Sequence, residues 1–435
     1  MFAHEVFNLK SELTMSDPSL LNIPYRFKAS KLYSQIPDSG LGDFVVSRSA
    51  SNAATRVNAQ GFIETVADNV PRLDYPIGGI AAGCPALLVE PSAANAILNS
   101  ANITTGWTLG ADLSSTAESF IGLSGRNLTV VNSTGIGLNA RLFTQPSPGI
   151  PLVSGTTYTI SFFMKKTGTH TIGGYAAFST IGDFGGGFNV ASPFTTGQVY
   201  SSVNIINRVR KIEQWGPDIF RCSETFTANA NGNIPFLAFG PLNAVNNQAS
   251  PAAGLGIAFA APQFETGSIA TSYIPTTTAP ITRGAEVVNK TGVSSLIGQT
   301  EGTIYVELDM RNFVTNAMAC FVSDGTGFNS ISVQIFAPPN SIRVGISRLG
   351  VGQIDFIVPM PSGVNKVALG YAQNNVAIYL NGTSVATSAV CLIPATSRVD
   401  LGSRIGTGSY LNDRIRSLAI YPTRLTNAQL QALTT

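Results

Sequence analysis

The stretch "APQFETGSIATSYIPTTTAP", residues 261–280, joins a β-prone run to an extended segment that ends in proline. Phe264, Glu265 and Thr266 read as the end of a strand. Pro275 and Pro280 lack the N–H that a sheet ladder needs, and each biases the residue before it toward extended backbone. The stretch is therefore predicted to be an exit strand followed by a connector, so that one folded unit ends here and another begins.

The composition favours β structure. Charged residues make up 11% of the 435 residues, against about 25% in an average soluble protein, and glycine (43) and proline (24) are frequent. Such a chain suits short strands joined by tight turns, and it lacks the charge pairs that long solvated helices use. At roughly 100–200 residues per domain, the length predicts about two to four domains.

The charge balance excludes some partners. A net charge of +2, spread along the chain, argues against nucleic-acid binding. No apolar run approaches the roughly 18 residues of a membrane span, so no membrane insertion is expected, and no signal peptide opens the chain. A weakly charged chain is prone to aggregate as a monomer, which favours a homo-oligomer. Met15 is expected to be the natural start, since "MSDPSLLNIP" reads as an N-terminus.

Metal and cofactor signatures are missing from the sequence. The four cysteines, Cys84, Cys222, Cys320 and Cys391, have no CxxC spacing and are expected to be buried free thiols, with a Cys320–Cys391 disulfide as the alternative. "SDGTG" (323–327) offers one carboxylate, whereas Ca²⁺ takes about six to eight oxygens, so it is read as a β-turn. No metal and no cofactor are expected.

Local patterns divide the chain. Residues 1–45 have apolar anchors but no period and are expected to be an N-terminal attachment arm. Residues 46–100 read as a small β-rich adaptor, with a turn at 58–61 and a strand at 86–89. Residues 101–275 alternate apolar and polar residues, which predicts a jelly roll, and residues 276–283 form a linker. Within the jelly roll, "TTYTISFFMKK" (156–166) should direct Tyr158, Ile160 and Phe162 to one face.

Residues 284–435 repeat the β pattern. "GTIYVELDM" (302–310) reads as a strand, and "NNVAIYLNGTSVAT" as a hairpin in which Asn381-Gly382 supplies the positive φ of a type I′ turn. "TNAQLQAL" fits a short helix that Thr426 caps, with Gln429 at the capping-box position. The fold class is thus predicted to be all-β: two antiparallel sandwiches in tandem behind the irregular arm and the small adaptor.

Three stretches resemble a known family. Residues 47–91, "SRSASNAATRVNAQGFIETVADNVPRLDY…CPALLVEP", resemble the N-terminal module of fibre and spike-like surface proteins of tailed bacteriophages. Residues 261–275 resemble the closing strand of a carbohydrate-binding-module-like jelly roll, and residues 377–432 resemble the last strands of a concanavalin A/laminin-G-like lectin sandwich. The resemblance implies a homotrimeric virion protein, on the tail or capsid surface and made in the host cytoplasm. It implies attachment to other virion proteins through the arm, and host glycan as the ligand.

Catalytic machinery is hard to assemble from this sequence. His4 and His170 are the only histidines, and His170 in "KKTGTHTIGG" is expected to lie on a surface loop. Glu213, Asp218 and Glu224 around Trp215 form the best acid group, read as a polar hairpin edge rather than a glycosidase pair. "FGGGFN" (184–189) lacks the Lys-Ser/Thr of a phosphate loop and is read as a flexible loop. The protein is therefore expected not to be an enzyme.

A sugar site needs an exposed aromatic plane among amides and carboxylates. Trp215, beside Gly216-Pro217, is the first candidate, and Tyr410, Asn412 and Asp413 at a predicted sandwich rim are the others. Trp107 is expected in the jelly-roll core, and Asp413 has the alternative of pairing with a neighbouring arginine.

Three functions fit these patterns. The first is a virion fibre or spike that binds host glycan without cleaving it. The second is a capsid decoration or head-fibre protein with a structural role, and the third is a polysaccharide depolymerase spike.

Overall fold

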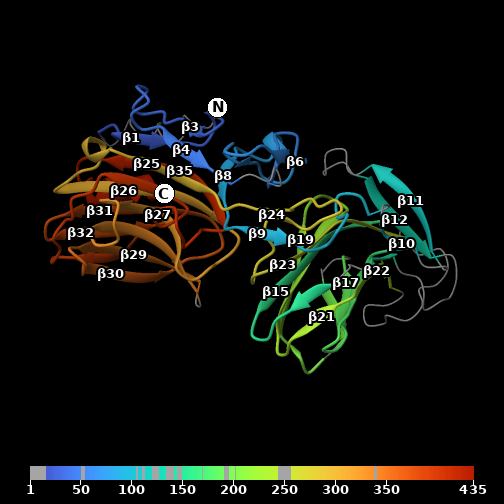
Figure 1. Cartoon of the computed structure of the whole chain (residues 1–435). Helices are drawn as coiled ribbons and strands as arrows, with labels where there is room; N and C mark the ends of the chain where they lie inside the picture. Colours follow the sequence, from blue (N-terminus) through green and yellow to red (C-terminus); the bar gives the residue numbers. More distant parts are fainter. Residues whose placement is uncertain are drawn as a thin grey trace.

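The computed structural model describes residues 16–49, 54–103, 106–109, 113–119, 127–133, 142–144, 149–168, 170–190, 195–200, 202–242, 256–337 and 340–435. It consists almost entirely of antiparallel strands arranged in two lobes (Figure 1). The predicted all-β fold class is confirmed. Met15, His4 and the first fifteen residues of the expected arm lie outside the described residues.

The lobe that contains the C-terminal residues, here called the sandwich lobe, is built from two facing sheets. The first sheet has the order β33 (Thr383–Ser388), β32 (Asn375–Leu380), β31 (Gly363–Ala372), β26 (Glu301–Met310), β35 (Asp413–Tyr421), β8 (Ala86–Val89) and β7 (Leu73–Asp74), and β1 (Leu20–Asn22) also pairs with β35. The second sheet has the order β2 (Phe27–Lys28), β3 (Lys31–Leu32), β4 (Phe44–Ser47), β25 (Val287–Thr291), β34 (Arg398–Leu401), β27 (Ala317–Ser323), β28 (Ser330–Phe336), β29 (Ser341–Arg348) and β30 (Val351–Pro359).

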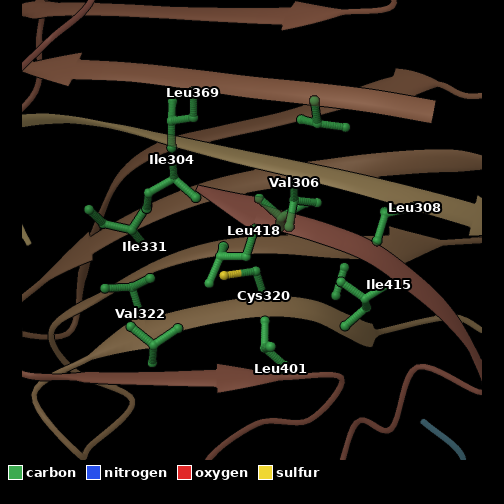
Figure 2. Packing of buried hydrophobic residues seen from close by; sticks show 14 of the residues in the cluster. Ile304, Val306, Leu308, Cys320, Val322, Ile331, Leu369, Leu401, Ile415 and Leu418 are labelled. Atoms are coloured by element: carbon green, nitrogen blue, oxygen red, sulfur yellow. The ribbon is translucent and has the colours of Figure 1, made fainter. Parts of the chain in front are cut away.

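The core between these sheets is made of alternating side chains. Ile304, Val306 and Leu308 point inward from β26, as their period of two predicts, and meet Cys320 and Val322 from β27 (Figure 2). Helix α2 (Asn427–Thr434) covers the outer face of the first sheet through a separate apolar cluster. Its predicted capping box, Thr426 with Gln429, is present.

The jelly-roll lobe is the second sandwich. One sheet has the order β10 (Thr108–Leu109), β13 (Leu142–Thr144), β22 (Phe236–Pro241), β16 (Ile172–Phe178), β17 (Phe184–Asn189) and β18 (Thr195–Tyr200). The other has the order β11 (Leu113–Ser119), β12 (Asn127–Ser133), β23 (Gly256–Thr266), β15 (Thr157–Lys166), β20 (Ile219–Ala228) and β19 (Ile205–Gln214). β14 (Ile150–Leu152) and β21 (Gly232–Ile234) form a small pair beside them.

Aromatic side chains fill the jelly-roll core. Tyr158, Ile160 and Phe162 point into it from β15, as predicted, and the Trp107 ring lies 5.8 Å from that of Phe239. The opposite face of β15 is not solvated, because Thr159, Ser161 and Phe163 are also buried. Ile63, Trp215 and Tyr273 pack against that face.

The expected division of the chain differs from the observed pairing of strands. Leu20 in β1 is the register partner of Ile420 in β35, and Val46 in β4 is that of Val288 in β25. The described part of the expected arm (16–45) and the strand of the expected adaptor at 86–89 are thus built into the sandwich lobe. The jelly roll is inserted between its two halves, and the sheets gain apolar burial from segments that are about 400 residues apart.

Two further strand pairs join the lobes. The segment expected to be a plain linker contains β24 (Ile281–Arg283), which pairs with β9 (Ala93–Asn95), so the chain enters and leaves the jelly roll along one two-stranded connector (Figure 1). β5 (Ala54–Val57) and β6 (Ile63–Val66) form the hairpin predicted around residues 58–61, and it lies between the lobes. Short 3₁₀ helices occur at Gly79–Ala81 and Ser294–Leu296.

Three local predictions were wrong. "FGGGFN" is the buried strand β17, where a Cβ at Gly185 would lie 2.3 Å from the Tyr175 carbonyl oxygen, so the glycine permits close strand packing rather than flexibility. His170 is buried, and burial lowers its pKa. Cys84 is exposed, whereas Cys222, Cys320 and Cys391 are buried free thiols, and burial raises the pKa of Cys320 to about 12.

Candidate functional site: the cleft between the lobes

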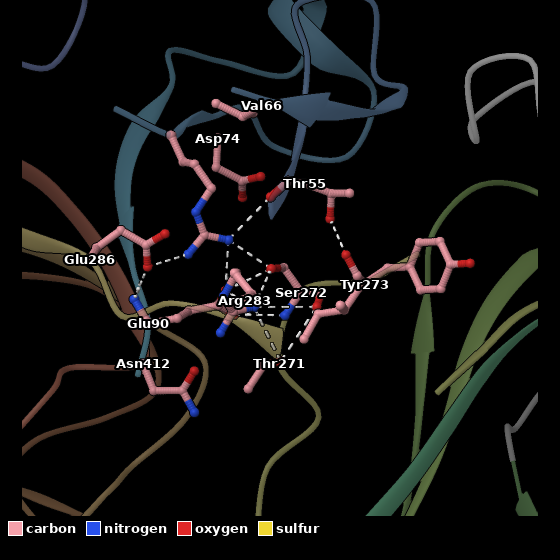
Figure 3. A network of polar contacts seen from close by, with 12 residues as sticks. Thr55, Val66, Asp74, Glu90, Thr271, Ser272, Tyr273, Arg283, Glu286 and Asn412 are labelled. Carbon is pink, nitrogen blue, oxygen red and sulfur yellow. Dashed lines mark hydrogen bonds and ion pairs between the residues drawn. The ribbon is translucent and has the colours of Figure 1, made fainter. Parts of the chain in front are cut away.

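A buried ionic network that includes Glu90, Arg283 and Glu286 fastens the two lobes (Figure 3). At its centre is Arg72, whose side chain has no exposed surface. Its Nη1 lies 2.7 Å from Glu90 Oε2, and its Nη2 lies 2.6 Å from Glu286 Oε2. Arg283 Nη1 adds a second cation 2.9 Å from Glu90 Oε2. Ser272, in the connector that follows β23, donates its Oγ–H and its backbone N–H to Glu90.

The carboxylates of this network have abundant partners. Burial alone raises the pKa of Glu90, but the nearby Arg283 and Arg72 charges and the Ser272 hydrogen bonds outweigh it and hold that pKa well below its usual range. Arg48 Nη1 contacts Glu286 Oε1 at 3.2 Å from the other side. With each carboxylate paired and hydrogen-bonded, the network is read as a structural fastening between the lobes.

A cleft of about 300 Å³ lies against this network, at the low end of the volumes of small-molecule sites. Three structural units form its walls: the outer face of β19–β20 with the adjoining loop, the β5–β6 hairpin, and the rim of the sandwich lobe. The residues that line it include Val209, Lys211, Glu213, Trp215, Arg221, Ser223, Ser268, Ile269, Ala270, Ser272, Tyr273, Thr55, Arg56, Ile63, Arg311, Asn312, Asn412 and Arg414.

Strand alternation explains the jelly-roll wall. On β19, Lys211 and Glu213 face the cleft, with Lys211 Nζ 2.7 Å from Glu213 Oε1. Arg208 and Arg210, which precede them on the same strand, face the opposite way and bind the fully buried Glu224. The basic run 208–211 is thus divided between the interior and the cleft.

Trp215 follows β19 and closes one end of the cleft. Its backbone N–H donates to the Ile219 oxygen at 2.7 Å, which fixes the turn. Its half-buried ring meets the Phe163 ring edge-on, with centroids 4.9 Å apart and planes at 85°. The same apolar cluster contains Ile63 of the hairpin and Tyr273 of the connector, so these segments cover the outer face of β15.

Asn412 comes from the sandwich rim with a left-handed backbone (φ 55°), a conformation that asparagine tolerates. Its side chain is 6% exposed, and its Oδ1 has no hydrogen-bond partner among the described residues. An unpaired buried amide oxygen costs about 1–3 kcal/mol. Asn412 thus lines the cleft with a buried amide oxygen that no group in the described part of the chain satisfies.

The structure brings together only part of the predicted sugar site. Trp215 and Asn412, which are far apart in sequence and in different lobes, line the same cleft. Tyr410 is not among the lining residues, and its hydroxyl donates to the Gly406 oxygen at 3.1 Å. Asp413 is buried and accepts the backbone N–H groups of Arg311 and Asn312.

Asp413 has a structural role instead. Burial raises its pKa to about 6, although Arg414 Nη1 lies 3.4 Å from its Oδ1 and favours the charged form. Pairing with an arginine was the alternative interpretation of this residue, and the contact is present. Asp413 positions the turn at Arg311 and Asn312, which line the sandwich side of the cleft.

Sequence reasoning missed several of the lining residues. Lys211 and Arg221 could have been found by following the alternation of β19 and β20 toward the face that carries Trp215. Arg311 and Asn312 gave no such signal, because they follow an ordinary strand and reach the cleft only through the packing of the two lobes.

The acid group around Trp215 does not converge. Glu213 faces the cleft, Glu224 points into the jelly-roll core, and Asp218 is exposed. Asp324, the carboxylate considered for Ca²⁺, accepts hydrogen bonds from Thr326 and Asn329 within its own loop. Across the described ranges, no group of three or more His, Cys, Asp or Glu side chains is placed to hold a metal ion. No helix in these ranges is long and apolar enough to cross a membrane.

Comparison with known proteins gives limited information. No family model matches the sequence, and a search of curated proteins found no match. Among solved structures, the chain is similar to the Ruminococcus gnavus IT-sialidase CBM40 bound to alpha2,3 sialyllactose, with 19% identity, a TM-score of 0.28, and coverage of 32% of this chain and 85% of that one. Domain 4 of the Geobacillus stearothermophilus arabinanase AbnA, in complex with arabinotriose, gives 15% identity, a TM-score of 0.29, and coverage of 35% and 73%.

The SAP-like pentraxin from Limulus polyphemus gives 16% identity, a TM-score of 0.23, and coverage of 30% of this chain and 68% of that one. Identities and TM-scores this low establish neither a shared family nor a shared ligand.

Proposed function

We propose that this protein binds a glycan and that the cleft between its lobes is the saccharide site. The observation that carries the proposal is the meeting of Trp215 with Asn412 in a cleft of about 300 Å³. An aromatic ring packs against the C–H face of a sugar, while amide and charged groups bind its hydroxyls. The lining of the cleft supplies both kinds of group, from residues of both lobes.

The test is a glycan microarray probed with the wild-type protein and with Trp215→Ala. Glycans bound by the wild type should lose signal with the variant, because the ring plane is gone. Trp107→Phe is the matched control, since Trp107 lies in the jelly-roll core, away from the cleft. Equal signals from Trp215→Ala and the wild type would place glycan binding elsewhere.

We propose further that the protein acts without cleaving the glycan. The opposed directions of Glu213 and Glu224 support this, because acid catalysis of glycoside cleavage needs two carboxyl groups on either side of one bond. Incubation with a bound polysaccharide, followed by analysis for released oligosaccharides, tests it. Release of fragments would favour the depolymerase instead.

The setting on a virion, as a trimeric fibre or spike, remains a proposal that rests on the resemblance of residues 47–91 and 377–432. A free arm at residues 16–45 no longer supports it, because strands β1–β4 belong to the sandwich lobe. Immunogold labelling of particles, with sedimentation of the purified protein, would test both the location and the trimer. Labelling on the capsid, with no glycan bound on the array, would favour a decoration protein.

A further inference from the structure

The charges of the cleft decide what kind of saccharide it accepts. Four of the five cationic side chains in its walls already have a carboxylate within hydrogen-bonding distance. Lys211 lies 2.7 Å from Glu213, and Arg414 lies 2.7 Å from Asp74. The other two pairs are Arg56 with Glu64 at 2.8 Å and Arg311 with Asp309 at 3.1 Å.

Arg221, the fifth cation, is held by neutral groups. Its Nη2 donates to the Thr271 oxygen at 2.5 Å and to Ser161 Oγ at 3.2 Å, and its guanidinium lies over the Phe163 ring. It is 7% exposed, and its Nε has no hydrogen-bond partner among the described residues. Glu213 is its register partner on the neighbouring strand. The charge of Arg221 is therefore balanced from close by, while one donor stays unused.

Glu213 makes the cleft unfavourable for an anion. Burial raises its pKa, but Lys211, Arg221 and, from the other lobe, Arg311 outweigh that effect and lower it, so Glu213 is ionised at neutral pH. A ligand carboxylate would meet this like charge. It would also have to displace an existing carboxylate partner from a cation. That displacement is most costly at the buried Arg414–Asp74 pair and least costly at the more exposed Lys211–Glu213 pair.

A hydroxyl group avoids both problems. It donates one hydrogen bond and accepts others without displacing a charge. Two lining residues carry a buried polar atom without a partner among the described residues, Asn412 Oδ1 in the sandwich lobe and Arg221 Nε in the jelly-roll lobe. Each is shielded from water, so a ligand hydroxyl pairs with it only after the side chain turns toward the open space. Paired guanidinium and carboxylate groups keep further N–H groups and lone pairs for neighbouring hydroxyls.

We propose that the cleft takes an uncharged, hydroxyl-rich saccharide that contacts both lobes at once. Trp215 packs against a sugar face. Asn412 and Arg311 contact the saccharide from the sandwich lobe, and Glu213 and Arg221 contact it from the jelly-roll lobe. This rests on the proposed function above and narrows its ligand class. The ion pairs of the walls exclude the acidic counterpart of the same sugar.

The experiment uses the full chain with Trp107→Phe, which leaves Trp215 as the only tryptophan and its fluorescence as the reporter. The probes are neutral trisaccharides of glucose, galactose and mannose, their uronic-acid counterparts, and 3′-sialyllactose. A neutral probe should bind at least tenfold more tightly than its acidic counterpart. Equal or tighter binding of the acidic probes would overturn the inference and leave glycan binding intact. Binding of no probe would contradict both.

Two variants sharpen this test. Glu213→Gln should raise the affinity for the acidic counterpart severalfold, because it removes the like charge and frees Lys211, while the affinity for the neutral probe changes little. Asp218→Asn is the matched control, as an exposed carboxylate on the same hairpin that does not line the cleft. The charge argument fails if the two variants behave alike.

The contact with both lobes is tested from the sandwich side. Asn412→Gly removes the amide and keeps a residue that adopts the left-handed backbone, and it should weaken the neutral probe severalfold. Asn316→Gly, at an exposed asparagine with φ 62°, is the control and should have no effect. Unchanged affinity in both Asn412→Gly and Arg311→Gln would show that the ligand contacts the jelly-roll lobe alone.

Discussion

The junction network and the cleft beside it are built from the same residue types but differ in packing. The junction side chains contact one another directly, whereas the cleft leaves about 300 Å³ of open space. They share Glu90 and Ser272. In the junction the carboxylates of Glu90 and Glu286 bind arginine, hydroxyl and backbone donors of the chain itself. Unpartnered polar atoms occur in both places among the described residues: Arg72 Nε and Arg283 Nε in the junction, and Arg221 Nε and Asn412 Oδ1 beside the cleft. Buried charge thus marks a structural fastening where arginines and carboxylates contact one another directly, and a candidate binding site where polar side chains border open space.

Breaking the junction should have the largest effect. Arg72→Met leaves Glu90 and Glu286 with fewer partners, and removing one member of such a buried group costs about 3–5 kcal/mol of unfolding free energy. Urea denaturation followed by circular dichroism measures it. Arg72→Lys, which keeps the charge but cannot bind both carboxylates in the same way, should fall between. A cost below about 1 kcal/mol for Arg72→Met would contradict the structural role.

Truncating the aromatic wall should be the next largest effect. Trp215→Ala should lower glycan affinity by about tenfold or more, which corresponds to about 1.4 kcal/mol. Trp215→Phe should retain part of the affinity, because a smaller ring remains. Isothermal titration calorimetry with the tightest neutral probe measures both. Loss of binding that coincides with unfolding in circular dichroism would assign Trp215 to packing rather than recognition.

Lowering the pH should reduce the contribution of the junction to the free energy of unfolding, while the neutral groups of the cleft do not titrate. The pKa of Glu90 is lowered in the folded protein, so its contribution to stability is complete above the usual glutamate value of about 4.3 and is lost as the pH falls below it. Denaturation midpoints should therefore fall below about pH 4.5. Glu90→Gln should be less stable at pH 7 and show a flatter acid dependence.

Asp413 acts in the opposite sense. Because burial raises the pKa of Asp413 to about 6, the folded state binds a proton at this carboxyl group more tightly than the unfolded state does. The stability gained from this protonation is complete below about pH 4 and is lost as the pH rises to about 6. Asp413→Asn should remove this component, and an unchanged profile in that range would show that the two backbone N–H groups and Arg414 keep Asp413 charged.

The smallest effect is expected for an exposed ion pair with the same chemistry. Arg343 and Asp355, on neighbouring strands β29 and β30, approach to 2.6 Å but are 36% and 53% exposed. Their coupling free energy in a double-mutant cycle with alanine should be about 0.2–1 kcal/mol, because water and salt screen the pair. A coupling as large as that of Arg72 with Glu90 would show that burial is not what separates the two cases.

Local patterns predicted the elements well. The β26 alternation, the Asn381-Gly382 turn and the Thr426 cap each depend on residues close in sequence, and each is present as expected. The glycine run at 184–189 gave a wrong prediction because glycine is common both in turns and in closely packed strands. The close approach of the Tyr175 carbonyl oxygen to Gly185 identifies the strand, and it is visible only in the structure. Of the predicted sugar-site residues, Trp215 and Asn412 reach the cleft, and Tyr410 and Asp413 turn to backbone partners.

The sequence by itself determined that this chain is made of short antiparallel strands and that a connector begins near residue 267, because side-chain alternation and proline act over a few residues. Only the tertiary structure decided that residues 20–47 complete the sandwich of residues 287–435, that the jelly roll is inserted between them, and that Trp215 and Asn412 line one cleft. Those outcomes depend on apolar faces and buried charges that contact residues hundreds of positions away in the sequence. A local pattern does not specify which of the distant segments will make these contacts.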